Sequence, residues 1–196
     1  MPRLLLSTSN PGKVREIREI LAGAGWDVVT PREVNVAFAA PVETARSYAE
    51  NAIAKAVAAT EASGLPALAD DSGIEVDALD GAPGPLSARF GGPTLTDVDR
   101  CELLLRRLEG IPPGRRGARF RAVVALALPG NRVITREGVL EGQIALAPRG
   151  ANGFGYDPVL ELTDGRTVAE LGAEKQALSH RARALASMAE VLRGLG

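Results

Sequence analysis

The sequence contains few cysteine, histidine and aromatic residues. Among its 196 residues are one cysteine, one histidine and one tryptophan, and the aromatic fraction is 4%. A single cysteine excludes an intramolecular disulfide and a cysteine-rich metal site, and a single histidine excludes a multi-histidine metal centre. Cys101 falls within the apolar pattern of residues 95–108, so we expect it in the core.

The chain also lacks an excess of either charge. Its 23 basic and 24 acidic residues give a net charge of −1, which argues against binding nucleic acid or an anionic membrane through overall charge. No apolar run approaches the roughly 18 residues that span a bilayer, and no secretory signal pattern opens the sequence. We therefore expect a cytoplasmic protein without nucleic-acid or membrane partners, in which any anion site is local.

Strand-like and helix-like segments alternate along the chain. The periodicity predicts strands at 3–7 and 27–30, and helices at 11–22, about 44–63, 95–108 and from about 179 onward. Two further strands, 119–128 and 132–143, are predicted to form a hairpin around Pro129-Gly130-Asn131. A hairpin within an alternating pattern predicts an α/β fold with a mixed sheet flanked by helices, and the length fits one domain over residues 1–196.

Residues 4–13, LLLSTSNPGK, raise the question of phosphate binding. They differ from a Walker A loop, which needs glycine where Ser7 stands and serine or threonine where Val14 stands. Asn10 as a cap and Pro11 in the first turn instead predict a helix whose free backbone N–H groups can bind an anion beside the final lysine. A capped turn with a solvated lysine explains the same residues.

Two adjacent carboxylates stand in the segment Ala69-Asp70-Asp71-Ser72-Gly73. We predict that they end a short apolar strand, where the glycine lets the backbone turn, and that residues 74–77 form a strand with one buried face. Paired carboxylates suit Mg²⁺, and one of them can orient or deprotonate a water. An acidic turn whose aspartates cap the backbone is the alternative interpretation.

Two later segments combine unusual residue types. Residues 150–158, GANGFGYDP, place two aromatic rings among three glycines, which suits close backbone approach and stacking on a ligand or, alternatively, anchors a long loop. Ser179-His180-Arg181 starts the last predicted helix. Because arginine in a first turn opposes the helix dipole, a nearby carboxylate or ligand oxygen would explain it, although a solvated surface is an alternative.

Taken in order, these segments resemble the inosine triphosphate pyrophosphatase family, also described as Ham1-like NTPases. The matching segments are Ser7 to Lys13, Glu50-Asn51-Ala52 with Lys55, Ala69 to Gly73, Ser87-Ala88-Arg89-Phe90, Gly153 to Pro158, and Ser179 to Ala182. The resemblance implies an elongated mixed α/β fold of two lobes with a nucleotide cleft between them, and a homodimer. It also implies Mg²⁺-dependent hydrolysis of noncanonical purine nucleoside triphosphates (ITP, dITP, XTP) to monophosphate and pyrophosphate, which removes them from the nucleotide pool.

The resemblance also implies roles for individual residues. Asp71 would accept a proton from the attacking water and bind Mg²⁺, with Glu43 as the second acidic ligand and Asp70 beside them. The implied triphosphate contacts are Thr8, Ser9, Asn10, Pro11, Gly12, Lys13, Lys55 and Ser72. The implied base contacts are Phe154, which would stack on the purine, then Gly155, Tyr156 and Asp157, and finally Lys175, His180 and Arg181 toward the 6-oxo edge. Ser9, in place of glycine, and Val42, in place of an acidic residue, depart from the family pattern.

Two other functions fit part of the sequence. The related septum-formation-inhibitor-like pyrophosphatases also begin with a strand, a polar turn and a helix, but their Ser-Pro-Arg-Arg turn is absent here. A nucleotide-binding sensor would have the pocket without turnover. The acidic residues Glu43, Asp70 and Asp71 argue against a sensor.

Overall fold

A computed structural model describes residues 1–8, 10–39, 41 and 47–195. In that part of the chain the strands form one sheet in the order β2-β1-β3-β4-β5-β6. The strands are β1 (Arg3–Leu6), β2 (Asp27–Val29), β3 (Ala67–Val76), β4 (Gly117–Leu128), β5 (Arg132–Ile144) and β6 (Leu160–Glu161). β1 pairs in parallel with β2 and β3, whereas β6 runs antiparallel to β5. The sheet is therefore mixed, which confirms the predicted α/β class.

The helices begin and end close to their predicted positions. They are α1 (Pro11–Ile20), α2 (Tyr48–Ser63), α3 (Asp97–Arg107), α4 (Lys175–Leu178) and α5 (His180–Arg193). The Asn10 side chain accepts hydrogen bonds from the first-turn amides of α1, and Gly64 ends α2 in the left-handed conformation. The Asn10 cap and the end of α2 at Ser63 confirm the sequence analysis, while the predicted start of α2 near residue 44 lies outside the described residues.

The chain forms two compact units. Unit 1 comprises Met1–Asp71, Ala122–Gly138 and His180–Gly196, and unit 2 comprises Ser72–Arg121 and Val139–Ser179. Strands β3 and β4 contribute residues to both units, as does β5. The cleft between two lobes that the resemblance implies stays a prediction.

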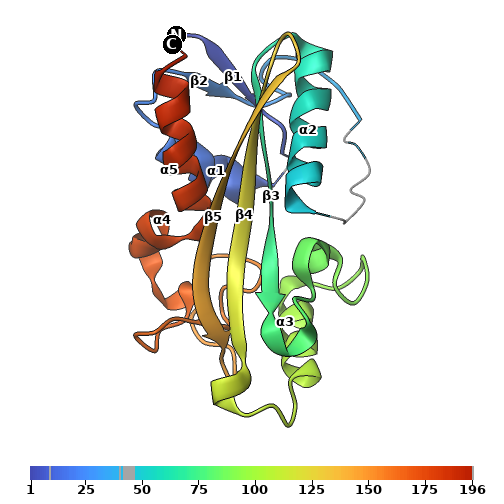
Figure 1. The fold of residues 1–196 in the computed structure, drawn as a ribbon, viewed down its shortest axis with the longest axis vertical. Coiled ribbons are helices and arrows are strands. Elements are labelled where there is room, and N and C mark those ends of the chain that lie inside the picture. Colours follow the sequence, from blue (N-terminus) through green and yellow to red (C-terminus); the bar gives the residue numbers. More distant parts are fainter. Residues whose placement is uncertain (9, 40, 42–46, 196) are drawn as a thin grey trace. The chain divides into compact units, whose positions relative to one another are not determined.

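Within unit 1, helices cover both faces of the strands (Figure 1). Leu68 of β3 packs in one cluster with residues of α1 and α5, and Ala69 packs in another with residues of α2. Successive side chains of a strand point to opposite faces. The next two residues, Asp70 and Asp71, therefore face different helices.

One sequence prediction about this strand is wrong. The segment Asp70-Asp71-Ser72-Gly73 does not end a strand, because β3 continues through it to Val76. Strands β1 and β4 flank β3 in the sheet. Cationic side chains neutralise both carboxylates, so the two aspartates can stay buried within a continuous strand. Beyond this segment, Ile74 and Val76 are buried and Glu75 is half-buried, as predicted for a strand with one buried face.

Unit 2 has its own hydrophobic core. Cys101 of α3 lies in that core at 3% exposure, together with apolar side chains from β3, β4 and β5. Burial raises the pKa of the Cys101 thiol to about 12. These observations confirm the prediction of a core cysteine.

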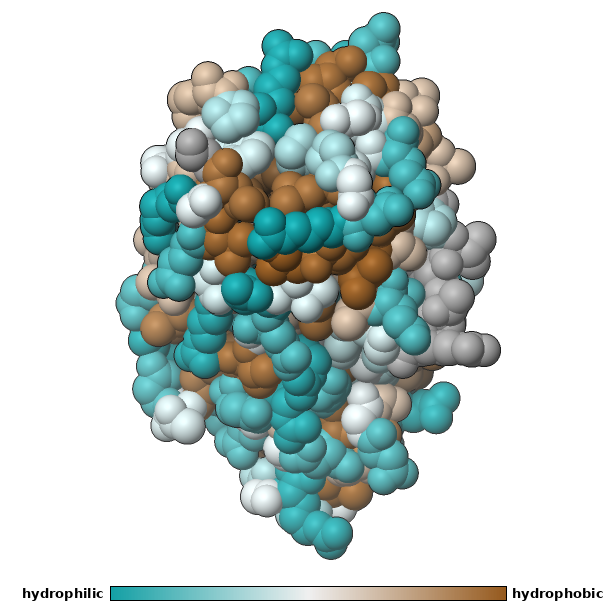
Figure 2. Space-filling view, turned by 45° about the horizontal axis from the view of Figure 1, so that its top comes forward, coloured by the Kyte–Doolittle hydropathy of each residue, from teal (hydrophilic) through white to brown (hydrophobic). Residues whose placement is uncertain are grey.

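The face drawn in Figure 2 is mostly hydrophilic, with a band of hydrophobic residues across it. In the described part of the chain no helix is long and apolar enough to cross a membrane.

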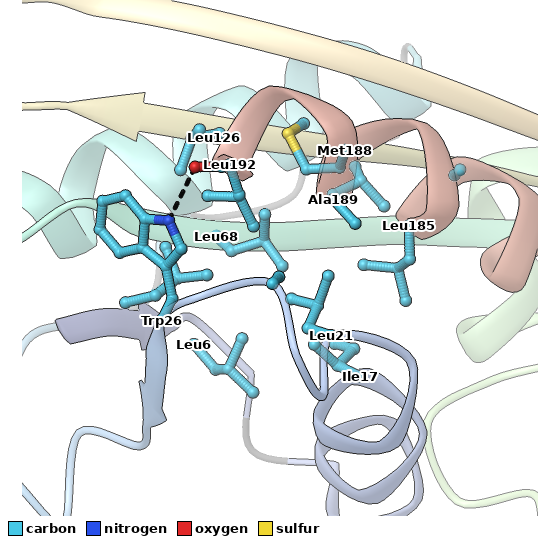
Figure 3. Close-up of a cluster of buried hydrophobic side chains, with 14 residues drawn as sticks. Leu6, Ile17, Leu21, Trp26, Leu68, Leu126, Leu185, Met188, Ala189 and Leu192 are labelled. Carbon is cyan, nitrogen blue, oxygen red and sulfur yellow. Dashed lines mark hydrogen bonds between the residues drawn. The ribbon is translucent and has the colours of Figure 1, made fainter. Parts of the chain in front are cut away.

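The main core of unit 1 includes the single tryptophan at one side of the cluster (Figure 3). Trp26 packs near Leu68 and Met188, and its indole Nε1–H donates a hydrogen bond of 2.9 Å to the carbonyl of Leu192. This bond ties the segment before β2 to the end of α5. Burial of an indole is favourable only when its N–H has a partner.

We expect Trp26→Phe to lower the free energy of unfolding by about 1–2 kcal/mol, because the Leu192 carbonyl loses its buried donor. Urea denaturation followed by far-UV circular dichroism measures this change without relying on tryptophan fluorescence. Leu195→Ala, at a position 36% exposed, serves as the control and should cost less than about 0.5 kcal/mol. Equal stability of Trp26→Phe and the unaltered protein would contradict the expectation.

Candidate active site

Asp70 is the most buried carboxylate of the candidate site. Its side chain has 0% exposure, and its Oδ2 lies 2.9 Å from Lys13 Nζ of α1 and 3.0 Å from Arg181 Nε of α5. Arg181 is itself 1% exposed and forms a second ion pair, 2.6 Å, with Glu16 of α1. Helices α1 and α5 are thus tied to strand β3 through alternating charges.

The surroundings of Asp70 keep it ionised. Burial alone would raise the pKa of this carboxyl, but the neighbouring charges of Lys13 and Arg181 more than offset that effect and hold the pKa well below its usual range. Its second oxygen, Oδ1, is buried and accepts no hydrogen bond from any residue that the structure describes. A buried carboxylate oxygen of this kind is suited to a cation or to a metal-bound water.

Asp71 lies on the opposite face of β3 and contacts α2. Asn51 donates a hydrogen bond of 2.9 Å to its Oδ2, and Lys55 Nζ lies 3.1 Å from its Oδ1. Asn51 and Lys55 stand four residues apart, so they share one face of α2. The side chain of Asp71 is 8% exposed, which leaves the carboxylate nearly buried between a neutral donor and a cation.

The start of α1 is a helix terminus capped by its own Asn10 side chain. Asn10 Oδ1 accepts hydrogen bonds from the amides of Gly12 at 2.9 Å and Lys13 at 3.2 Å, and the Asn10 amide donates to Thr8 Oγ1 at 3.2 Å. A hollow of about 770 Å³ borders this turn; it is lined by Thr8, Pro11, Val14, Arg15, Arg18, Glu19, Thr30, Pro31 and Arg32. The hollow therefore lies near the positive end of the α1 dipole and is lined by the cationic side chains of Arg15, Arg18 and Arg32.

Unit 2 contains the loop of residues 150–158, which carries Phe154 and Tyr156 and is called the aromatic loop below. Asp157 Oδ2 accepts a hydrogen bond from the Phe154 amide at 2.9 Å and forms an ion pair of 2.8 Å with Lys175. The Lys175 ammonium lies 4.6 Å from the centre of the Phe154 ring, within the range of a cation–π interaction. A Cβ atom at Gly153 would lie 2.0 Å from Asp157 Oδ2, so only glycine fits this turn. The loop is ordered around one buried carboxylate.

The three lysines of the chain share one arrangement. Each forms an ion pair with an aspartate of the predicted site; the pairs are Lys13 with Asp70, Lys55 with Asp71 and Lys175 with Asp157. The interpretation of Lys13 as a solvated residue is therefore wrong, because its side chain is 16% exposed. All three lysines of the chain therefore lie next to buried carboxylates.

The predicted site residues divide between the two units. Unit 1 contains Thr8, Asn10, Pro11, Gly12, Lys13, Lys55, Asp71, His180 and Arg181. Unit 2 contains Ser72, Phe154, Gly155, Tyr156, Asp157 and Lys175. Ser9 and Glu43 lie outside the described residues. In unit 1 the contacts form two groups on opposite faces of β3, one around Asp70 and one around Asp71, and in unit 2 Phe154 and Lys175 gather around Asp157.

The last helix starts inside the protein. His180 and Arg181 are 6% and 1% exposed, so the interpretation of this pair as a solvated surface is wrong. Glycine is required on the adjacent strand, because a Cβ atom at Gly138 of β5 would lie 2.1 Å from the His180 carbonyl oxygen. The carboxylates of Asp70 and Glu16 explain why an arginine is tolerated in a first helical turn.

Sequence reasoning missed two functional contacts. Asn51 belonged to a matching segment but had no assigned role, and Glu16 was not singled out. Glu16 stands three residues after Lys13, which places both on one side of α1. That spacing was the available signal, but the partner that joins them, Arg181, is 165 residues away in the sequence.

The ordered motifs and this geometry agree with a match to a family model. Residues 4–191 match the model described as the Ham1 family. The chain belongs to the Ham1 family. This confirms the resemblance inferred from the motifs, and nearly the whole chain carries the match.

Ham1-family relatives of known name are similar over their full length. A dITP/XTP pyrophosphatase of Symbiobacterium thermophilum is 50% identical over 196 residues, covering 98% of this chain and 96% of the relative. The solved structure of a HAM1 protein from Coxiella burnetii is 40% identical, with a TM-score of 0.89 over 99% of this chain and 100% of that one. The crystal structure of a nucleoside-triphosphatase / dITP/XTP pyrophosphatase from Mycobacterium abscessus is 41% identical. Its TM-score is 0.78, and the match covers 95% of this chain and 98% of that one.

We expect Asp70→Asn to lower the free energy of unfolding by about 3–5 kcal/mol at pH 7, because Lys13 and Arg181 lose a buried counter-charge. The pKa of Asp70 is lower in the folded chain than when unfolded, so its stabilisation is present above about pH 4 and is lost as pH falls toward the lowered value. The free energies of unfolding of Asp70→Asn and of the unaltered protein should therefore differ by about 1 kcal/mol less at pH 3 than at pH 7.

Urea denaturation at both pH values measures these differences, with Asp27→Asn at an exposed position of β2 as the control. A difference that is the same at pH 3 and pH 7 would contradict the assigned ionisation of Asp70.

Proposed function

We propose that this chain is a Mg²⁺-dependent pyrophosphohydrolase of noncanonical purine nucleoside triphosphates such as dITP, XTP and ITP. The observation that carries the proposal is the arrangement on β3: two adjacent aspartates face opposite sides of one strand, and each is paired with a lysine from a different helix. The similarity to a dITP/XTP pyrophosphatase at 50% identity supports the same reaction.

The triphosphate binds at the start of α1 and at the two lysines of unit 1. A triphosphate in water carries several negative charges, so binding and cleavage require groups that offset charge. The positive end of the α1 dipole and the ammonium groups of Lys13 and Lys55 supply such groups, and Ser72 adds a hydroxyl. Because both lysines already face carboxylates, the substrate competes with Asp70 and Asp71 for them.

Asp71 accepts the proton of the attacking water. Its two oxygens are oriented by Asn51 and Lys55, so the carboxylate is held in place before substrate binds. The water oxygen forms a new bond to phosphorus, the bond between the α- and β-phosphates breaks, and pyrophosphate leaves. A nearby cation favours the ionised carboxylate, which is the form that can act as the base.

The donor set fits Mg²⁺. Asp71 and Glu43 would hold the ion through carboxylate oxygens, the type that Mg²⁺ prefers. The buried Asp70 Oδ1, which has no hydrogen-bond partner among the described residues, lies on the opposite face of β3 from Asp71 and is not counted in this donor set. Among the described residues no three His, Cys, Asp or Glu side chains form a metal-binding group, and Glu43 lies outside them. When bound, the ion would offset charge on the phosphate oxygens.

The purine binds at the aromatic loop of unit 2. The Phe154 ring offers a stacking surface, Gly155 and Tyr156 shape the pocket, and Asp157 fixes the loop. Lys175, from the same unit, donates toward the 6-oxo oxygen. A site built around such donors rejects a 6-amino purine, because the analogue leaves buried donors without acceptors. Arg181, buried between Asp70 and Glu16 of unit 1, holds the Asp70 carboxylate in place.

We further propose that the two compact units act as one catalytic domain over residues 1–196, since three strands contribute to both. The protein is expected to act in the cytoplasm as a homodimer. A sensor without turnover is the second candidate, and the paired, oriented Asp71 favours an enzyme over it.

We expect pyrophosphate, and not orthophosphate, to be released from dITP, ITP and XTP in the presence of Mg²⁺. The ratio kcat/KM for these substrates should exceed that for ATP by at least about a hundredfold, because the 6-oxo donors discriminate against adenine. Separate assays for the two products, with ATP and GTP as control substrates and with Mg²⁺ present or chelated, measure this. Release of orthophosphate, or equal use of ATP, would contradict the proposal.

We expect Asp71→Asn to lower kcat by about 10²- to 10⁴-fold, because the amide keeps the shape of the carboxylate but cannot accept the proton of the water. Steady-state hydrolysis of dITP measures the loss. Asp80→Asn, at an exposed position, is the matched control and should retain full activity. Undiminished hydrolysis by Asp71→Asn would remove Asp71 from the mechanism, and absence of turnover in the unaltered protein would favour the sensor.

A further inference from the structure

Helix α3 holds the aromatic loop through the residue between its two rings. The Gly155 amide donates a hydrogen bond of 2.8 Å to Asp97 Oδ2, and the Gly155 carbonyl accepts a hydrogen bond of 3.4 Å from Cys101 Sγ. Asp97 is the first residue of α3, and Cys101 lies one turn later. Both polar backbone groups of Gly155 are therefore bound by one short stretch of helix.

Sterics do not fix Gly155. Its φ is +61°, in the left-handed region that favours glycine, and a Cβ atom there would meet nothing within 4 Å. A hollow of about 340 Å³ adjoins it; it is lined by Asp97, Val98, Cys101, Pro148, Gly150, Ala151, Asn152, Gly153, Phe154, Gly155 and Pro158. Because the loop borders open space on the side of α3, hydrogen bonds rather than close packing hold it there.

The neighbouring residues of the loop have anchors of their own. Asp157 binds the amide of Phe154, and the Tyr156 hydroxyl donates a hydrogen bond of 2.9 Å to the Ser87 carbonyl. The contact from α3 is the anchor between them. Losing it leaves the peptide that follows Phe154 with the hydrogen bond from the Asp157 amide to the Phe154 carbonyl at 3.3 Å, and this peptide carries the ring that is presented to a ligand.

We propose that Asp97, supported by Cys101, is a positioning residue that orients Phe154 for stacking on the purine. This inference rests on the proposed function. It gives helix α3 a role in nucleotide binding, although no residue of α3 takes part in the proposed bond-breaking step. Asp97 acts through Gly155 and touches neither the phosphates nor the attacking water. Its loss should therefore weaken nucleotide binding and leave the bond-breaking step nearly unchanged.

The test compares three variants by steady-state hydrolysis of dITP and by thermal unfolding. Asp97→Ala removes the acceptor, and we expect KM to rise about five- to tenfold with kcat within about twofold. Asp97→Asn keeps an acceptor oxygen at the same place and should restore KM to within about twofold to threefold of the unaltered protein.

The third variant, Asp99→Ala, is the matched control. Asp99 is also acidic and in the first turn of α3, but its side chain closes the capping box with Thr96. This variant should lower the melting temperature by weakening the helix start, with KM unchanged. A loss of α3 stability alone would move KM in Asp99→Ala as much as in Asp97→Ala.

Four results would overturn the positioning role: unchanged KM in Asp97→Ala, a loss confined to kcat, no rescue by Asp97→Asn, or an equal rise in Asp99→Ala. Each presupposes that the unaltered protein hydrolyses dITP, so each leaves the proposed function intact. If the unaltered protein releases no pyrophosphate from dITP, the proposed function fails, and the role of Asp97 fails with it.

Discussion

The burial of two adjacent carboxylates in strand β3 is the constraint on which the candidate site depends. An ionised carboxylate is costly to bury unless cations and hydrogen bonds compensate it. Asp70 and Asp71 point to opposite faces of β3, so one helix layer cannot supply both sets of partners. Helices α1 and α5 compensate Asp70, and α2 compensates Asp71. The same contacts that permit burial assemble the candidate site.

Positioning and folding are therefore closely linked in unit 1. Arg181 is useful to Asp70 only when α5 packs against the sheet, and that packing depends on the apolar cluster around Trp26 and Leu185. Unit 2 follows the same pattern on a smaller scale, because Asp157 organises its loop through Lys175 and the Phe154 amide. In both units a buried anion is the organising centre, and its basic partner comes from another segment, 111 residues away for Arg181 with Asp70 and 18 residues away for Lys175 with Asp157.

Local signals predicted much of this fold. The cap at Asn10, the end of α2 at Gly64 and the hairpin before Arg132 each depend on a few neighbouring residues, so the sequence was sufficient for them. The strand through Asp70 was not predictable in this way, because its continuation depends on cations more than 50 residues away in the case of Lys13, and 111 residues away in the case of Arg181. Patterns among neighbouring residues are therefore enough to predict caps and turns. They do not predict which distant cation will neutralise a buried carboxylate.

The scarcity of lysine has a chemical consequence. Because the chain has three lysines and each is paired with an aspartate of the candidate site, the remaining basic side chains are arginines, which do not react as amines. Acetylation or carbamylation of any lysine side chain would remove the positive member of a buried ion pair, whichever lysine it reached. The protein therefore has no lysine at which such a modification would be electrostatically neutral for the site.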